Sequence, residues 1–246
     1  MLAVIRIILA SILSVSICIL GIIYCILRPR HPNNTAFLGR LFGSMAPIFG
    51  ITVEIRNLLK DKLPKNCIYI SNHQNNYDMV TVSCIVPPRT ITVGKKNLLW
   101  IPLFGQLYWL CGNILINRSR RFTAYNTVLK IVRSIKVDNI SLWVFPEGKR
   151  SFNKGLLPFK TSIFHAAISN KIPIVPICVS NLNNKVKLNR WSNGVVIIEI
   201  MPPIDTAGYN LSQVRYVTKY CYMIMKNRID SLSKESLQRE DHNLVN

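Results

Sequence analysis

A histidine and an aspartate five residues apart form the first group in this sequence that could do chemistry. His73 and Asp78 lie in the stretch Cys67-Ile-Tyr-Ile-Ser-Asn-His-Gln-Asn-Asn-Tyr-Asp. Asp78 is the only acidic residue between Asp61 and Asp138, in a region rich in Lys and Arg. A carboxylate that holds one imidazole nitrogen leaves the other ready to take a proton, so the pair is a candidate general base.

Local structure decides whether the two side chains meet. In a continuous α-helix, residues five apart point about 140° away from each other, because a helix has 3.6 residues per turn. The sequence instead predicts a buried strand over Cys67–Ser71, a turn over Asn72–Asn76, and a helix over Tyr77–Ile85 with Asn75 or Asn76 as N-cap. This turn would fold His73 onto Asp78. The alternative is a surface histidine near an unrelated aspartate in the first turn of a helix.

A second isolated carboxylate lies in the loop Phe145-Pro-Glu-Gly-Lys-Arg-Ser. Glu147 is the only acidic residue between Asp138 and Glu199, and it follows the predicted buried strand Ile140–Phe145. Such loops carry functional groups because the strand end is rigid while the loop is exposed. Glu147 could accept a hydrogen bond from a substrate hydroxyl, and Arg150 offers a planar fork that suits a phosphate. The alternative is a solvated turn with a local Glu–Arg pair.

Further cations follow other predicted strands. Arg118 ends the short strand Gly112–Arg118, and Lys95 or Lys96 follows the strand Thr90–Val93. Any single Lys or Arg is more often a solvated charge than a ligand. All of these segments lie just past a predicted strand end, however, and loops at the same edge of a sheet can converge on one pocket.

The elements that must position these residues alternate between strand and helix. Two more strands are predicted over Ile174–Ser180 and Val195–Met201. Helices are predicted over Val128–Ile135, opened near Ser119 or Thr123, and over Phe159–Ser169 and Tyr209–Leu232. The polar residues Lys234–Asn246 are expected to fray. This alternation predicts an α/β fold with a mixed sheet flanked by helices.

The N-terminal segment is apolar enough to enter a membrane. No charged residue occurs from Ile7 to Leu27, and Arg28 and Arg30 follow at once. The run is about one bilayer long, and the positive residues after it place the rest of the chain in the cytoplasm. A cleaved signal peptide is disfavoured because no A-x-A site follows. A bilayer span and an insertion into one leaflet both stay open, because Arg6 interrupts the start and Ala36–Phe49 could lie in the interface beside it. We expect a helical membrane anchor at 1–50 and a second domain at 51–246.

The composition limits the classes of function. The 246 residues carry a formal net charge of +20, yet 49% are hydrophobic and only 17% are charged. An apolar chain with a basic surface suits an anionic membrane or an anionic substrate. A nucleic-acid binder would also be basic, but no zinc-finger spacing, RRM aromatic motif or clustered basic run occurs. The seven cysteines form no C-x-x-C and mostly lie in apolar runs, so we expect buried thiols rather than disulfides or a metal site.

Several catalytic schemes are excluded by the motifs. Gly148-Lys149 is no Walker loop, because Trp143 stands where the first glycine is needed and Arg150 replaces Ser or Thr. There is no G-x-S-x-G elbow for a serine nucleophile and no G-x-G-x-x-G for a dinucleotide. The histidines at positions 31, 165 and 242 have no partner at metal-ligand spacing. We therefore expect neither a metal nor a cofactor.

The ordered set of motifs resembles the 1-acylglycerol-3-phosphate acyltransferase family, and closely its bacterial members. The family's H-x-x-x-x-D motif matches His73 to Asp78, and its F-P-E-G-x-R-S block matches Phe145–Ser151. A strand that ends in Arg matches Gly112–Arg118, and a proline-bracketed strand matches Ile172–Pro176. The sequence departs from the family at two positions. Asn117 stands where many relatives carry Asp, which puts a carboxylate role there in doubt, and Lys149 stands where many carry Thr, a change that activity should survive.

The resemblance implies a reaction and its participants. A fatty acyl group would pass from acyl carrier protein or coenzyme A to the sn-2 hydroxyl of lysophosphatidic acid, giving phosphatidic acid. It implies His73 as general base oriented by Asp78. The substrate-binding positions that it implies are Lys95, Arg118, Glu147, Gly148 and Arg150.

The same resemblance implies a setting. The domain at 51–246 would be the catalytic domain, on the cytoplasmic face of the inner membrane among anionic phospholipids, with no nucleic-acid partner. Two other functions remain open. One is a member of the same family that acylates another lysophospholipid or glycerol 3-phosphate. The other is a non-catalytic basic membrane-binding protein.

Overall fold

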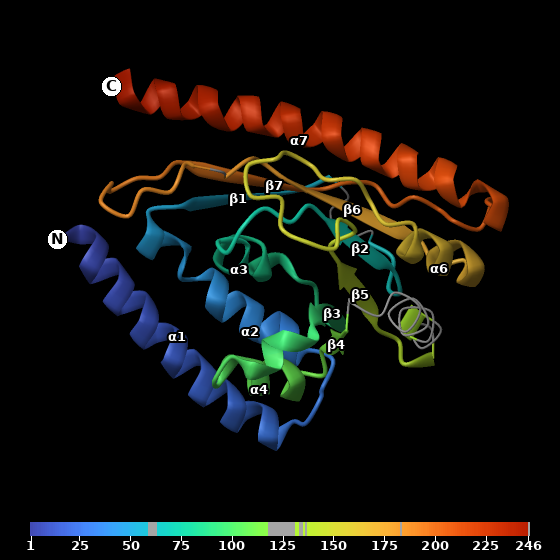
Figure 1. Cartoon of the computed structure of the whole chain (residues 1–246), viewed down its shortest axis with the longest axis horizontal. Coiled ribbons are helices and arrows are strands. Elements are labelled where there is room, and N and C mark those ends of the chain that lie inside the picture. The colour runs from blue at the N-terminus through green and yellow to red at the C-terminus, as the bar shows by residue number, and fades with distance from the viewer. Residues whose placement is uncertain (59–62, 118–130, 133–134, 136, 183, 246) are drawn as a thin grey trace.

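The computed structural model describes residues 1–58, 63–117, 131–132, 135, 137–182 and 184–245, with side chains described as far as residue 240. Within these residues a single sheet has helices on both faces (Figure 1). The α-helices are α1 (Leu2–Leu27), α2 (Asn34–Gly43), α3 (Asp78–Thr81), α4 (Phe104–Leu110), α6 (Ser162–Asn170) and α7 (Val214–Val245). Short 3-10 helices are η1 (Ala46–Phe49), η2 (Ser83–Ile85), η3 (Lys96–Trp100) and η4 (Leu211–Gln213).

The described strands form one mixed sheet in the order β1-β7-β6-β2-β5-β3-β4. They are β1 (Thr52–Asn57), β2 (Ile68–Ser71), β3 (Thr90–Lys95), β4 (Ile114–Ile116), β5 (Ser141–Val144), β6 (Ile174–Val179) and β7 (Val195–Ile200). Every neighbouring pair is parallel except β6 with β7, which is antiparallel. The predicted α/β fold with a mixed sheet is confirmed, and each predicted strand lies within two or three residues of an observed one.

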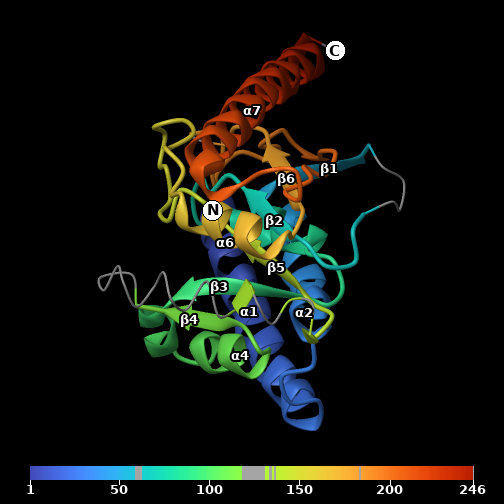
Figure 2. The same cartoon turned by 90° about the vertical axis from the view of Figure 1, so that its right-hand side faces the viewer.

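The centre of the sheet is covered on both faces. All residues of β2 and β5 are buried, which is typical of parallel strands with helices on each side. Ile68 and Ile70 belong to the core formed with α6 and α7, whereas Tyr69 and Trp143 belong to the core formed with η1 and η2. Figure 2 shows α6 and α7 on one side of the sheet and α1, α2 and α4 on the other. Most of the predicted helix Val128–Ile135 lies outside the described residues.

Helix α1 carries an apolar surface that the protein does not cover. It packs on α2 and α4, but Ile8, Ile12, Leu20 and Ile23 are each more than half exposed. Within the described chain, α1 is the helix that is long and apolar enough to cross a membrane. This surface therefore fits membrane association.

The second apolar stretch, Ala36–Phe49, is mostly part of the protein core rather than a free interfacial segment. Leu38 and Phe42 of α2 are buried in a cluster with residues of α1 and α4. Only the outward side chains of α2, such as Phe37 and Leu41, stay more than a third exposed. The segment thus connects α1 to the body of the protein.

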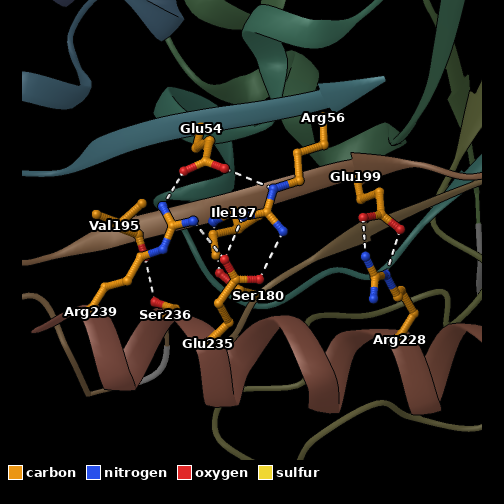
Figure 3. A network of polar contacts seen from close by, with 10 residues as sticks. All are labelled: Glu54, Arg56, Ser180, Val195, Ile197, Glu199, Arg228, Glu235, Ser236 and Arg239. Carbon is orange, nitrogen blue, oxygen red and sulfur yellow. Dashed lines mark hydrogen bonds and ion pairs between the residues drawn. The ribbon is translucent and has the colours of Figure 1, made fainter. Parts of the chain in front are cut away.

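The expected fraying of Lys234–Asn246 is wrong as far as Val245, where α7 ends, while Asn246 lies outside the described residues. Two ion pairs hold the end of this helix on β1, as Figure 3 shows. Arg56 lies 2.5 Å from Glu235, and Arg239 lies 2.5 Å from Glu54. These guanidinium groups lower the pKa of Glu235 to about 2, chiefly through its hydrogen bond with Arg56. A polar helix end that would fray alone is ordered here by partners on the sheet.

Candidate active site

Four of the candidate segments lie at one edge of the sheet. Strands β2, β5, β3 and β4 are consecutive parallel neighbours, so their carboxyl ends point the same way. His73 follows β2 and Glu147 follows β5. Lys95 ends β3 and Asn117 follows β4. Neighbouring strands lie about 4.8 Å apart, so these segments lie side by side at one edge of the sheet, as predicted. Arg118 itself lies outside the described residues.

The predicted contact between His73 and Asp78 is present. His73 Nδ1 lies 2.5 Å from Asp78 Oδ2. Asp78 is buried, whereas the imidazole keeps 17% of its surface exposed. Because an ionised carboxylate only accepts hydrogen bonds, Nδ1 carries the shared proton. In the neutral ring, Nε2 then has a free lone pair, which is the state that a general base needs.

The turn between β2 and α3 brings the two side chains together. The backbone N–H of Gln74 donates to Asp78 Oδ2 at 2.8 Å, so one carboxylate oxygen serves both the turn and the imidazole. Asn75 Oδ1 accepts a hydrogen bond from the N–H of Tyr77 at 2.9 Å. Asn75 therefore shapes the turn, but the residue at the N-cap of α3 is Tyr77 and not the predicted asparagine.

The predicted helix over Tyr77–Ile85 is wrong in its continuity. An α-helical turn, α3, gives way to the 3-10 turn η2. The hydroxyls of Thr81 and Ser83 donate back to the backbone carbonyls of Tyr77 and Met79. Such bonds compete with regular helix, and the prolines at positions 87 and 88 stop any extension.

Amide side chains on both sides of His73 tie the turn to the end of β6. Asn72 Nδ2 donates to the carbonyl of Val179 at 3.0 Å, and its Oδ1 accepts from the N–H of the same residue at 2.9 Å. Gln74 Nε2 donates to the carbonyl of Ser180 at 2.8 Å, and its Oε1 accepts from the N–H of Leu182 at 2.8 Å. The sequence indicates a turn at Asn72 and Gln74 but gives no sign of their partners, which lie more than 100 residues away.

The imidazole also has an aromatic neighbour. The rings of His73 and Phe145 stack, with centroids 4.1 Å apart and planes at 15°. Phe145 is the first residue of the Phe-Pro-Glu-Gly loop, so this loop supports the face of the ring while Asp78 holds its edge. The two contacts together fix the orientation of the imidazole.

Glu147 binds backbone groups on both sides of the site. Its Oε1 accepts from the N–H of His73 at 2.6 Å, and its Oε2 accepts from the N–H of Leu157 at 2.9 Å. The side chain is only 4% exposed. Burial raises the pKa of Glu147 to about 7, although the two backbone N–H groups act in the opposite direction. The carboxylate thus has protein partners on each oxygen, and its predicted contact with a substrate hydroxyl stays a prediction.

The loop after Glu147 gathers positive charge. Lys149 and Arg150 are exposed, and Gly148 has a φ of +73° that favours glycine. A Cβ at Gly148 would lie 2.6 Å from Cε and 2.7 Å from Nζ of Lys160, so this lysine lies directly over the glycine. The N–H of Lys160 also donates to the carbonyl of Pro146 at 2.9 Å. Sequence reasoning missed Lys160, because a lone lysine twelve residues after Gly148 gives no signal of its own.

No group of metal ligands accompanies this arrangement in the part of the chain that the structure describes. There, no three His, Cys, Asp or Glu side chains come together as a metal site. All seven cysteines are free, and six of them are fully buried. The arrangement offers an oriented base beside exposed cations, which suits proton removal from a hydroxyl on an anionic molecule.

Comparison with known proteins places the chain among acyltransferases. The family model "Acyltransferase" matches residues 50–180. The 1-acyl-sn-glycerol-3-phosphate acyltransferase of Escherichia coli is 52% identical over 240 residues, which cover 98% of each chain. Its namesake from Haemophilus influenzae is 51% identical over 235 residues, covering 96% of this chain and 98% of the relative. The alpha form from Homo sapiens is 31% identical over 192 residues, covering 77% of this chain and 68% of the relative.

A solved structure has the same fold. The crystal structure of the 1-acyl-sn-glycerophosphate acyltransferase from Thermotoga maritima superposes with a TM-score of 0.69. The match covers 94% of this chain and 97% of that protein at 21% sequence identity. The likeness supports the architecture, while the sequence relatives carry the assignment to a family.

Proposed function

The chain belongs to the 1-acyl-sn-glycerol-3-phosphate acyltransferase family, an enzyme family that acylates lysophosphatidic acid, and we propose that His73 is its general base. The single observation that carries this proposal is the 2.5 Å contact between His73 Nδ1 and the buried Asp78 carboxylate. It leaves Nε2 as the proton acceptor on an imidazole that keeps 17% of its surface exposed. An alcohol is a poor nucleophile until a base takes its proton, and such a base contributes about 10²–10⁴-fold in rate.

The reaction needs no covalent enzyme intermediate. Nε2 of His73 takes the proton of the sn-2 hydroxyl while that oxygen attacks the thioester carbonyl. The tetrahedral intermediate then collapses, the carbon–sulfur bond breaks, and the imidazolium returns the proton to the leaving thiolate. Asp78 keeps the proton on Nδ1 and stabilises the imidazolium, as the aspartate does in serine-hydrolase triads. The products are phosphatidic acid and a free thiol.

The cations at the sheet edge suit the phosphate of the substrate. Arg150 and Lys95 are exposed at the same edge as His73, and Lys160 adds a third charge above Gly148. Arg150 offers two parallel N–H donors, which match a phosphate better than a single ammonium does. We propose Arg150 as the main phosphate ligand, with Lys95 and Lys160 adding to the positive field. Glu147 holds the backbone of His73, and its contact with the glycerol hydroxyl stays a prediction.

The way in which the protein meets the membrane follows from α1. Its N-terminal end is bonded to the body through Arg6, whose guanidinium donates to the carbonyls of Leu188, Arg190 and Trp191. Its C-terminal end is bonded through the N–H of Arg30 to the carbonyl of Leu110 at 3.1 Å. A helix held at both ends by one body lies along that body. We propose that α1 enters one leaflet without crossing, on the cytoplasmic face of the inner membrane.

An assay with labelled acyl donors tests the proposal. Membranes that contain the chain should convert lysophosphatidate to phosphatidate, and H73A should remove this conversion while the protein stays with the membrane fraction. Acyl carrier protein and coenzyme A thioesters compared side by side identify the donor. Glycerol 3-phosphate and lysophospholipids without a free phosphate serve as alternative acceptors. A near-normal rate in H73A would exclude the general-base role.

A further inference from the structure

The loop before β7 exposes a tryptophan that neither the fold nor the active site uses. Trp191 is 81% exposed and is flanked by the basic residues Lys187 and Arg190. Among the described residues, neither of these two forms an ion pair, whereas the nearby Lys185 is bound to Glu240 at 2.9 Å. Arg190 Nε donates to the carbonyl of Ser192 at 2.8 Å, but no described carboxylate neutralises either charge. An exposed indole beside such positive charges is the composition found where proteins meet the surface of a bilayer.

This loop is fixed to the start of the membrane helix. Arg6 is buried, and its guanidinium nitrogens lie 3.1, 2.6 and 2.8 Å from the carbonyls of Leu188, Arg190 and Trp191. The backbone N–H of Ala3 donates to Asn189 Oδ1 at 2.9 Å. In Figure 1 the N-terminus accordingly lies beside the turn between β6 and β7. The position of Trp191 is thus tied to that of α1.

The other side of the loop rests on Gly50. This glycine has a φ of +68°, and a Cβ there would lie 2.3 Å from the carbonyl oxygen of Trp191. Asn193 adds three side-chain bonds. Its Nδ2 donates to the carbonyls of Phe49 at 2.7 Å and Lys187 at 3.1 Å, and its Oδ1 accepts from the N–H of Lys187 at 2.9 Å. The backbone that carries Trp191 is thus held on both sides, by α1 and by the Phe49–Gly50 segment.

The apolar surface of α1 begins at the same place. Val4, Ile5 and Ile8 surround Arg6 in sequence and are each more than half exposed. At the far end of α1, Trp109 is 49% exposed and lies under the Arg30 guanidinium, 5.5 Å from its ring centroid. Each end of the apolar helix therefore has an exposed indole next to an arginine. A helix that lies flat in one leaflet would have both ends at the depth where indoles and headgroups meet.

We propose that residues 187–191 form a second membrane-docking element, which places Trp191 in the interfacial layer and Lys187 and Arg190 against anionic phospholipid headgroups. The occupant is a lipid surface because the loop is bonded to the first turns of α1, where the exposed apolar side chains of that helix begin, and it is an anionic one because the exposed charges are positive. The inference rests on the one-leaflet placement of α1 proposed above, but not on acyl transfer.

Tryptophan fluorescence of the full chain in vesicles tests this placement. The chain has four tryptophans, so the difference between wild type and W191F isolates the emission of Trp191. In vesicles that contain phosphatidylglycerol, this component should shift to shorter wavelength and be quenched by phosphatidylcholine brominated in its acyl chains. It should also lose its accessibility to acrylamide. An unshifted Trp191 component that acrylamide still quenches as it does in detergent would overturn the proposal.

The basic pair is tested against a matched pair on the opposite side of the sheet. K187Q/R190Q removes one Lys and one Arg from the loop, and R215Q/K219Q removes the same charges from exposed positions on α7. Each loop charge should contribute a factor of about five to docking on an anionic surface, or about 25-fold for both. Quenching of Trp191 should thus need more phosphatidylglycerol in the loop variant only. Equal quenching in all three proteins would overturn the role of anionic headgroups.

Two further measurements distinguish membrane docking of the loop from binding of a carrier protein and from the acyltransferase function. Slower transfer from acyl carrier protein but not from coenzyme A in K187Q/R190Q, with unchanged quenching, would overturn membrane docking in favour of a carrier-protein surface. Transfer in detergent micelles should be normal in W191F. If wild type made no phosphatidate there, the acyltransferase function would fail while the fluorescence result would still decide the docking of the loop.

Discussion

Replacing Glu147 with Gln should change how the stability of the protein depends on pH. Burial raises the pKa of this carboxyl from 4.5 to about 7 in the folded protein. Each unit of pKa corresponds to about 1.4 kcal/mol of differential interaction between the two protonation states. Ionisation of Glu147 therefore costs the folded state about 3 kcal/mol relative to the unfolded chain.

The direction in which stability changes with pH depends on whether the folded or the unfolded state holds the proton of Glu147 more tightly. Between pH 4.5 and about 7 the folded protein keeps this proton and the unfolded chain releases it. The stability that this group contributes is fully present below the lower value and is lost as the pH rises through the upper one. Gln does not ionise, so E147Q avoids this loss. In acid the protonated carboxyl can still accept at both oxygens from the N–H groups of His73 and Leu157, whereas the NH2 group of Gln cannot accept. The variant should therefore be the less stable protein in acid and should gain on wild type as the pH rises.

Melting temperatures of both proteins in the same detergent, from about pH 5 to about pH 8, measure the effect. For a chain of this size, 1 kcal/mol shifts the melting temperature by about 2–4 °C. The difference between E147Q and wild type should therefore change by roughly 6–12 °C over the range. Other titrating groups are common to both proteins and cancel in the difference. A difference that stays constant within about 2 °C would refute the assigned cost of burying this charge.

Three other substitutions have distinct expected outcomes. H73A should lower kcat by about 10²-fold or more with unchanged recovery in the membrane fraction, and a loss of protein from that fraction would indicate misfolding instead. R150A should raise KM for lysophosphatidate more than it lowers kcat, with R150K intermediate, and an unchanged KM would remove Arg150 from the phosphate site. R228M should cost about 3–5 kcal/mol of stability, because it leaves the buried Glu199 carboxylate without its guanidinium partner. Thermal melting of R228M beside R228M/E199L measures this cost, and equal melting temperatures of the two variants would contradict it.

The fold could be predicted where the signal is local. The strands β5 and β6 are continuous apolar runs, and each was identified to within two residues at either end. The end of α7 could not be predicted, because the partners of Glu235 and Arg239 lie on β1, nearly 180 or more residues earlier in the chain. A polar segment at a chain end is expected to fray, and here tertiary ion pairs hold it on the sheet.

In the candidate site, too, contacts between residues close in sequence could be predicted and contacts between distant segments could not. The contact between His73 and Asp78 could be predicted, because turn residues fill the space between them and a continuous helix would separate them. The bonds from Gln74 to Leu182 and from Glu147 to His73 could not, since each joins segments more than 70 residues apart. Residue type showed Glu147 to be isolated from other acids, but only the fold shows that its carboxylate faces backbone N–H groups rather than solvent.

Hydrogen bonds to the backbone of His73 and Gln74 explain how the proposed base is held in place. The N–H of His73 donates to Glu147, and its carbonyl accepts from Ser151 at 2.9 Å. The N–H of Gln74 donates to Asp78, and its carbonyl accepts from the N–H of the residue after Ser151 at 3.0 Å. All four backbone groups of the His73–Gln74 segment are thus bonded before any substrate arrives. The entropy of ordering the base is then lost during folding rather than in the transition state. Loosening any of these bonds should therefore lower kcat and leave the affinity for the phosphate of the substrate largely intact.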